Sequence, residues 1–493
     1  MLKFNIPTKP SIARLLTFLF AGSIAACGQP SNSSAPEFSQ SEWLPGGQAT
    51  VTPQNQIRFD YPAANLPVDQ KTQFHAGKAL AQQPWIKAPT ITDSRDGLGP
   101  LYNARTCMAC HLKGGKGALP KDASTPIFSS LIRISLKGED KQNGAIPHPA
   151  YGDQIQVQST SLAHQLRHLP SAKSLAKDVV PEAYVYINWQ EQIFQYPDQT
   201  KVMLKRPTPV FKQLGYGEIE SDTLVGIRTA PTIHGMGLIE LIPQLQIDAL
   251  TDEQDKNNDG ISGRTNQVWD VETQSTVAGR FGLKANKPTL IMTVAGAFAN
   301  DLGISNPLFK SQPCTSAQES CLSAATGNNK NGVELNQAQL NLVVDFNRNL
   351  APLKARDLDS KNAIEGRELF YKTGCNQCHN PSFKTQKSKR LPHLSNQTIW
   401  PYSDFLLHDL GSELSDNRPD FKASGSEWRT PPLWGIGLRD EVNGSQALLH
   451  DGRASTIEEA ILWHGGEAQS IKNSFIELDK NDRDKLIIFV NSI

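Results

Sequence analysis

Apolar residues recur at intervals of three or four in two separate stretches of the chain, which is the spacing of one helix face. These residues are Leu340, Val343, Val344 and Phe346 in the first stretch, and Leu486, Ile487, Phe489 and Val490 in the second. A shorter helix is predicted around Ile364 and Leu369, with Gly366 between them. Because glycine has no Cβ, Gly366 lets a second helix cross closely, and Gly77 is predicted to do the same earlier in the chain.

The first residues have the pattern of an export signal. Three basic residues precede the apolar run 15–20, and small residues then lead to Cys27. This segment is too short to span a bilayer and is typical of a secretory signal peptide, here residues 1–26. Its end matches a bacterial lipobox, which predicts a lipid anchor on Cys27; a plain cleavage site with an unmodified cysteine is the alternative.

Residues 27–48 are rich in Ser, Pro, Gln and Asn, and this composition predicts a flexible, lipid-anchored tether. The signal predicts an exported protein that faces the periplasm, and Gly28 instead of aspartate after the cysteine favours attachment to the outer membrane. The 493 residues exceed one ordinary domain, so at least two are expected. The formal net charge of +0 argues against a nucleic-acid partner, which would leave a basic footprint.

Two five-residue motifs carry the clearest chemistry, Cys107-Met108-Ala109-Cys110-His111 and Cys375-Asn376-Gln377-Cys378-His379. In a C-x-x-C-H motif both thiols add to haem vinyl groups and the adjacent histidine binds the iron. A thioredoxin-like dithiol is the alternative for one such motif, but it does not explain two that each end in histidine. We therefore predict two covalently bound haem c groups on Cys107, Cys110, Cys375 and Cys378, with His111 and His379 as iron ligands.

The signals after the two motifs follow the same order. An Arg-Thr-x-Pro stretch begins at Arg228 in the first half and at Arg429 in the second, and each leads into a glycine-punctuated segment. Guanidinium groups suit carboxylates, so these arginines are candidates to bind haem propionates; ordinary ion pairs are the alternative. The remaining cysteines, Cys314 and Cys321, are predicted to form a disulfide in an exported compartment, or else stay as free thiols.

This repeated order predicts a mainly α fold of two cytochrome c-like helical haem domains. We place the N-terminal domain at residues 49–355 and the C-terminal domain at residues 356–493. Insertions at 112–225 and 241–275 enlarge the N-terminal domain, and some short strands are expected there, for instance over 129–135.

A histidine on an apolar helix face is a candidate sixth iron ligand for the second haem. With Thr456 as the predicted N-cap, apolar residues lead at i, i+3 and i+4 to His464 at i+7. Such a histidine is more often a satisfied core residue, but the haem of this half requires a further ligand. We therefore predict that His464 binds iron.

The order C-x-x-C-H, Arg-Thr-x-Pro and His-Asp-Gly-Arg-Ala resembles the bacterial di-haem cytochrome c peroxidase superfamily, and in particular its branch of di-haem oxidoreductases. The resemblance covers residues 70–493. Further supporting stretches are Gly97–Ala104, Asp259–Arg264, Gly279–Gly282 and His464–Ala468.

The resemblance implies a division of labour between the haems. The C-terminal haem is implied to transfer electrons, and His464 stands where the superfamily has the sixth ligand, which implies a bis-histidine haem of lower potential than a His/Met one. The N-terminal haem is implied to be peroxidatic, with a distal carboxylate that moves a proton. The implied catalytic acid is Asp301, with Glu240 as the alternative and a purely structural aspartate as the other interpretation.

Besides His464, which stands where classical peroxidases have methionine, this chain departs from the superfamily pattern at two points. The tryptophan between the haems is replaced by Phe281, with Trp269 nearby in sequence. The capping histidine soon after the first motif is absent, because no histidine occurs between His111 and His148. The alternative sixth ligands of the first haem are His148, His164, His168 and His234.

A calcium site is also predicted. Asp255, Asn257 and Asp259 occupy positions 1, 3 and 5 of a loop similar to that of an EF-hand, and Gly260 permits the sharp turn. Position 12 is Asn266 instead of glutamate, which weakens the affinity for Ca2+, and a plain Asx-rich turn is the alternative.

We expect an enzyme, an oxidoreductase of peroxidase type that reduces hydrogen peroxide at the N-terminal haem with electrons entering through the C-terminal haem. The alternatives are an electron-transfer di-haem lipoprotein and a protein-modifying di-haem oxidase. The expected donor is a small protein of cytochrome c or cupredoxin type, or a quinol-linked donor.

Overall fold

The computed structural model describes residues 34–91, 95–161 and 179–493. The predicted signal peptide and the lipidation site at Cys27 lie outside the described residues. Among those described, none of the helices is both long and apolar enough to cross a membrane. The described part of the predicted tether packs on the fold, since Glu42 is only 3% exposed and forms an ion pair of 2.9 Å with Arg367.

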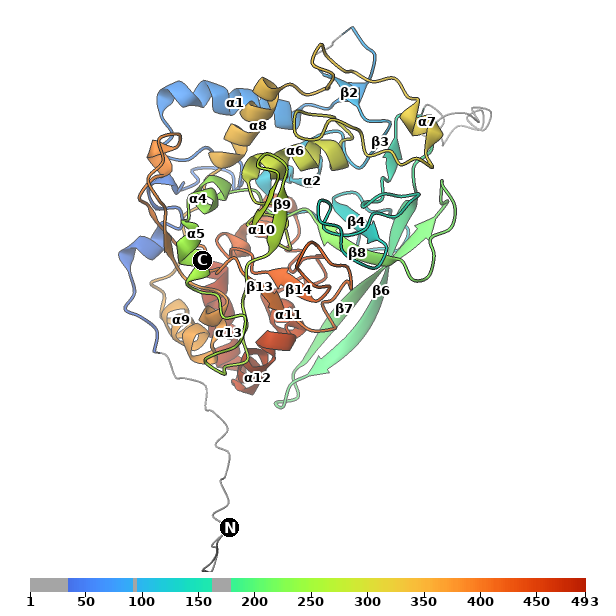
Figure 1. The fold of residues 1–493 in the computed structure, drawn as a ribbon. Helices are drawn as coiled ribbons and strands as arrows, with labels where there is room; N and C mark the ends of the chain where they lie inside the picture. Colours follow the sequence, from blue (N-terminus) through green and yellow to red (C-terminus); the bar gives the residue numbers. More distant parts are fainter. Residues whose placement is uncertain (1–33, 92–94, 162–178) are drawn as a thin grey trace, which may run out of the picture. The chain divides into compact units, whose positions relative to one another are not determined.

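Short helices and strands alternate along the described chain (Figure 1). The helices are α1 (Val68–Gln82), α2 (Cys107–Cys110), α4 (Met236–Glu240), α5 (Gln244–Asp248), α6 (Leu290–Asp301), α7 (Glu319–Leu322), α8 (Gln337–Arg348), α9 (Lys361–Thr373), α10 (Arg439–Asn443), α11 (Ile457–Trp463), α12 (Gln469–Glu477) and α13 (Lys480–Ser492). The strands are β1 (Ile86–Lys87), β2 (Asp96–Leu98), β3 (Leu101–Tyr102), β4 (Ser130–Ser135), β5 (Gln158–Ser159), β6 (Tyr184–Gln195), β7 (Lys201–Lys212), β8 (Leu224–Thr229), β9 (Gln267–Asp270), β10 (Ser275–Ala278), β11 (Phe383–Lys384), β12 (Thr398–Ile399), β13 (Leu407–Asp409) and β14 (Glu427–Arg429).

The predicted mainly α fold is wrong, because the structure is 29% helix and 18% strand. The strands form two-stranded sheets, β1–β2, β3–β5, β4–β8, β6–β7, β9–β10, β11–β12 and β13–β14. Two of these sheets, β11–β12 and β13–β14, lie in the second half, where helices were expected to dominate. The chain carries 36 glycines and 32 prolines, which break helices and favour turns, so much of it pairs as short ribbons instead.

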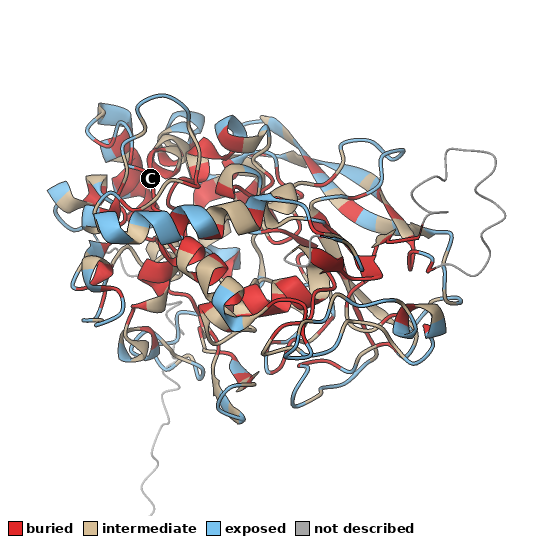
Figure 2. Ribbon diagram, turned by 90° about the horizontal axis from the view of Figure 1, so that it is seen from above, coloured by how far each residue is buried: buried red, intermediate tan, exposed pale blue. Residues whose placement is uncertain are grey.

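The long helices form two close pairs, α1 with α8 and α9 with α13 (Figure 1). A Cβ on Gly77 of α1 would lie 2.1 Å from the Leu342 carbonyl oxygen, and one on Gly366 of α9 would lie 2.0 Å from that of Lys485. Both predicted glycine crossings are therefore confirmed. The apolar faces of α8 and α13 turn into the protein, and Figure 2 shows helices that are red on one side and pale blue on the other.

The glycine-punctuated segments after the two Arg-Thr-x-Pro stretches also match in structure. Gly235 and Gly435 have φ angles of +74° and +70°, which glycine adopts without strain. Two residues later, a Cβ on Gly237 would lie 2.2 Å from the Arg348 carbonyl oxygen, and one on Gly437 would lie 2.2 Å from that of Asn491. The repeated sequence order is therefore a repeat in space, with each segment packed on the end of its own closing helix.

The hairpin β6–β7 reaches from the first half to helices of the second (Figure 1). At its tip Tyr196 is 1% exposed and donates a hydrogen bond of 3.0 Å to the Glu458 carboxylate of α11. In the same loop, Asp198 forms an ion pair of 2.6 Å with Arg483 of α13. The insertion thus contributes to the core around the second motif. Outside these insertions, the predicted disulfide between Cys314 and Cys321 is confirmed.

Candidate functional site

One cavity of about 460 Å³ joins both halves of the molecule. It is lined by eight residues of the predicted haem sites: Cys107, Cys110, His111, Asp301, Cys375, Cys378, His379 and His464. Glu240 is not among the lining residues, and its carboxylate instead pairs with Arg348 at 2.6 Å. The structure therefore brings the two motifs, the candidate sixth ligand and one candidate acid to a single space.

Each C-x-x-C-H motif places its two thiols on one short helical turn. The first forms α2, capped by the Thr106 hydroxyl, which accepts a hydrogen bond of 3.0 Å from the Ala109 N–H. The second follows Gly374, whose φ of +93° ends α9 and turns the chain into a 3-10 helix. Burial raises the pKa of Cys107 and Cys110 to about 12 and that of Cys375 to about 11, so these thiols stay protonated at neutral pH.

Three cavity histidines are anchored in the same way, each through Nδ1 to a backbone carbonyl. The contacts are His111 to Pro231 at 2.7 Å, His379 to Tyr402 at 3.0 Å and His464 to Ala460 at 2.7 Å. Burial lowers the pKa of all three imidazoles, that of His379 to about 4, so each is neutral. A neutral imidazole that donates from Nδ1 has its lone pair on Nε2, and this arrangement is typical of metal-binding histidines.

The helices α6 and α11 begin in the same way but differ at one cavity position. Phe281 pairs with Lys287 just before α6, as Leu448 pairs with Ala454 just before α11. The side chains of Thr289 and Thr456 then cap the two helices, which confirms the predicted N-cap at Thr456. The eighth residue after the threonine is Ala297 in the first half and His464 in the second, and both line the cavity. The first half thus has a methyl group where the second has an imidazole.

Asp301 lies one helical turn beyond Ala297, at the end of α6. Its Oδ1 accepts a hydrogen bond of 2.8 Å from the Gln154 side-chain amide, which also lines the cavity. Burial raises the pKa of Asp301 to about 6, which suits a group that exchanges protons near neutral pH. Gln154 was not predicted from the sequence, because it lies in the insertion 112–225 with no motif around it.

Lys116 and Arg439 are buried cations of the cavity wall and Arg429 is a half-buried one, and none of these forms an ion pair among the described residues. Burial lowers the pKa of both arginines to about 10 and that of Lys116 to about 7. A buried cation without a counter-ion is costly, so these side chains favour an anionic ligand. Arg228 differs, because it is paired with Asp416 at 2.7 Å and Asp420 at 2.9 Å.

An aromatic stack lies in the cavity wall where the sequence predicted none. Trp428 of β14 stacks on His450, with ring centroids 3.5 Å apart and planes inclined by 10°. Phe281 lines the same cavity, whereas Trp269 does not. Nothing in the residues around Trp428 marks it, because its position depends on the pairing of β14 with β13.

Of the alternative sixth ligands of the first haem, the two that lie among the described residues are not at the cavity. His234 is 1% exposed and stacks on Phe59 at 4.2 Å, and it is not a lining residue. His148 contacts Glu220 at 2.9 Å, also away from the cavity. His164 and His168 lie outside the described residues.

The predicted calcium loop folds as an exposed turn. The Asp255 carboxylate accepts hydrogen bonds from the Asp259 N–H at 2.9 Å and from the Gly260 N–H at 3.1 Å. The Asn257 amide donates to Asp259 at 3.0 Å. Asn266, at position 12, is fully buried and donates to the Asp420 carbonyl at 2.9 Å, so its side chain is engaged elsewhere. Calcium binding stays a prediction.

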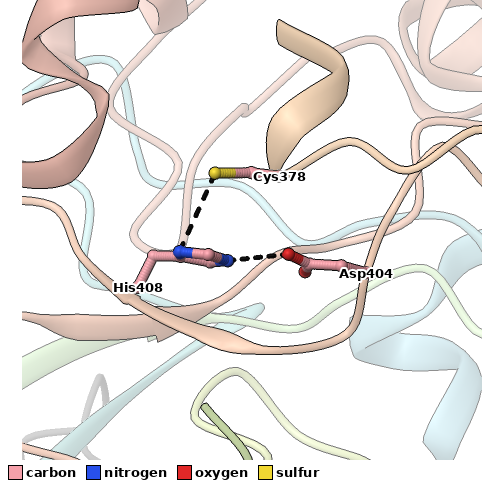
Figure 3. Close-up of side chains that lie close together, drawn as sticks. All are labelled: Cys378, Asp404 and His408. Carbon is pink, nitrogen blue, oxygen red and sulfur yellow. Dashed lines mark hydrogen bonds and ion pairs between the residues drawn. The ribbon is translucent and has the colours of Figure 1, made fainter. Parts of the chain in front are cut away.

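Among the described residues, one group of three side chains has ligand atoms close enough to share a metal ion, Cys378, Asp404 and His408 (Figure 3). These atoms lie within 4.8 Å of one another. The sequence analysis singled out Cys378 of this group but neither Asp404 nor His408.

Residues 42–493 match the protein family described as "di-haem oxidoreductase, putative peroxidase". The match spans both motifs, both threonine-capped helices and the whole cavity. No curated protein and no solved structure matches the chain.

Proposed function

Because this chain belongs to the di-haem oxidoreductase family, we propose that it is a c-type peroxidase that reduces hydrogen peroxide at its first haem site. The family supports an oxidoreductase with haem cofactors. Three finer assignments rest on the residues of the cavity. They are the covalent attachment of haem, the difference between the two haems, and peroxide as the oxidant.

The cavity residues fit two c-type haems. Cys107 and Cys110 would attach one group and Cys375 and Cys378 the other, with His111 and His379 binding iron through Nε2. The unpaired cations of the wall, Lys116, Arg429 and Arg439, would bind the anionic propionates. Haem iron supplies one-electron chemistry and, where a coordination position is open, a place for peroxide to react.

The observation that carries the proposal is the difference between Ala297 and His464. The His464 imidazole would supply the sixth ligand of a haem bound at the second site, which suits electron transfer. The Ala297 methyl group at the matching place cannot bind iron and leaves space for a small oxidant. We therefore assign electron entry to the second site and peroxide to the first.

Asp301 is the proposed acid–base group, held in place by Gln154. Its carboxylate accepts a proton from one oxygen of hydrogen peroxide and returns it to the other as the O–O bond breaks. Two electrons from a donor and two protons then convert each peroxide to two molecules of water.

The expected export and lipid anchor place this reaction in the periplasm, with the protein held at the outer membrane through Cys27. A small donor protein of cytochrome c or cupredoxin type, or a quinol-linked donor, would supply the electrons. Acyl-chain labelling of the wild type and of Cys27→Ser tests the anchor, and loss of the label only in the variant is the expected result.

Electron paramagnetic resonance of the oxidised holoprotein, with and without peroxide, tests the function. One high-spin ferric signal that peroxide changes, beside one low-spin signal that it does not, is the expected result. Two low-spin signals that peroxide leaves unchanged would contradict the proposal and favour an electron carrier.

A further inference from the structure

The two haem-attachment sites differ in the charge that lies beside them. In the first site the Cys110 sulfur lies 3.7 Å from the Phe128 carbonyl, a neutral group. In the second site the Cys378 sulfur lies 3.8 Å from Nδ1 of His408 on β13 (Figure 3). The peroxidase proposal makes no use of His408.

His408 is held between two carboxylates. Its Nε2 lies 2.7 Å from Asp404 and its Nδ1 lies 2.8 Å from Glu467. The side chains of His408 and Asp404 are 3% and 2% exposed, and that of Glu467 is 12% exposed. A carboxylate accepts hydrogen bonds, so both ring nitrogens must carry a proton, which makes His408 an imidazolium. Burial alone would lower the pKa of His408, but the charge of Asp404 raises it well above its usual value.

The cluster of Asp404, His408 and Glu467 contacts two segments of the second site, the attachment motif and the residues after His464. The Asp404 N–H donates to the Cys378 carbonyl at 2.9 Å, next to the iron ligand His379. Glu467 lies three residues after His464, and its carboxylate also accepts hydrogen bonds of 2.9 Å from the Ser262 N–H and hydroxyl. Asp404 therefore connects His408 to the backbone of Cys378, and Glu467 connects it to the segment that follows His464.

We infer that His408 is a positioning residue that raises the reduction potential of the second haem through a fixed positive charge beside Cys378. This inference rests on the proposed attachment of a haem at Cys378 but requires no peroxidase activity. Adding one electron to an iron makes the site one charge more negative, and a nearby cation in a low-dielectric interior favours that change. Asp404 and Glu467 act in the opposite direction, so removing one member of the cluster shifts the potential with a predictable sign.

Two isosteric variants separate charge from structure, with potentiometric titration of both haems as the measurement. His408→Gln removes a positive charge, so the second haem should become harder to reduce. The ferric to ferrous ratio at a fixed potential is expected to rise on the order of tenfold, a shift of about 59 mV for a one-electron couple. Glu467→Gln removes a negative charge and should raise the midpoint potential of the second haem. The midpoint potential of the first haem should stay unchanged in both variants.

His148→Gln is the matched control, because His148 is also buried and also paired with a carboxylate, at 2.9 Å from Glu220, but lies away from the cavity. It should leave both midpoints unchanged. Shifts of the same sign in His408→Gln and Glu467→Gln, or no shift in either, would overturn the inference. If His408→Gln does not fold, Glu467→Gln tests the inference by itself. An unchanged or lowered midpoint potential of the second haem in that variant would overturn the inference.

Two further readouts distinguish this inference from the proposed function. Mass spectrometry that finds no haem on Cys378 would overturn both, whereas normal attachment with unmoved midpoints would overturn only the role of His408. Stoichiometric zinc in the purified holoprotein, bound by the group of Figure 3, would also overturn it, because a metal-bound imidazole is not an imidazolium.

Discussion

The two halves share a framework around the cavity, although insertions enlarge the first half, and they differ at one matching cavity position. Both have a helix pair crossed at a glycine, an Arg-Thr-x-Pro segment packed on the closing helix, and a threonine-capped helix that faces the cavity. At the matching helix position the first half has Ala297 and the second has His464. Under the proposed function, this one difference in side chain would let a repeated architecture hold a reactive iron in the first half and an electron-transfer iron in the second.

The largest expected effect comes from removing the acid of the first half. Asp301→Asn should lower peroxide turnover by roughly 10²–10⁴-fold, because the amide cannot accept and return a proton. The measurement is steady-state oxidation of a reduced small cytochrome by peroxide. Glu240→Gln is the control, since Glu240 pairs with Arg348 away from the cavity, and its turnover should stay within a few-fold of wild type. A larger loss in Glu240→Gln than in Asp301→Asn would assign the acid to Glu240.

Exchanging the residues at the matching position should exchange the properties of the halves. Ala297→His should convert the high-spin signal of the first haem to low spin and abolish most peroxide turnover, because an imidazole would fill the open position. His464→Ala should create a second high-spin signal. Spin states that do not change in either variant would show that α6 and α11 are not equivalent.

The pH dependence of kcat/KM for peroxide tests the role of Asp301. As a base it must be ionised, and its pKa is raised to about 6 by burial. The kcat/KM for peroxide should therefore fall as the pH drops below about 6, by roughly tenfold per pH unit. Asp301→Asn should have lower activity but no such decline, and a decline that persists in the variant would assign it to another group.

The smallest effects are on stability, and they should be alike in the two halves. Gly77→Ala and Gly366→Ala each place a Cβ near 2 Å from a carbonyl oxygen of the partner helix, and overpacking of this kind costs about 1–3 kcal/mol. The apparent thermal midpoint of each holoprotein variant should fall. Gly296→Ala is the control, because its Cβ would meet no neighbour closer than 3.7 Å. Unequal losses would indicate that one crossing matters more than the other.

Local patterns predicted much of the site. Cys107, Cys375 and their neighbouring histidines are marked by five consecutive residues, and His464 by helical periodicity, so no long-range information was needed. The close crossings at Gly77 and Gly366 were also predicted, because a glycine within an apolar helix face has a specific physical meaning.

The remaining features depend on contacts between distant segments. Trp428 reaches the cavity because β14 pairs with β13, and Gln154 reaches Asp301 across 147 positions of the chain. The short sheets were missed for a second reason. Strands of two or three residues have too few positions to show a period of two. The fold class was therefore predicted wrongly, because helices were expected to dominate around the two motifs.

The reach of the hairpin β6–β7 has a consequence for how this protein can be divided. Tyr196 and Leu204, both from the first half of the chain, belong to the same apolar core as Trp463 and Phe475 of the second. A fragment that began after the first closing helix would expose this surface to water and lose the contacts of Tyr196 with α11. The second half is therefore not a free-standing cytochrome that could be transplanted into another protein without its hairpin.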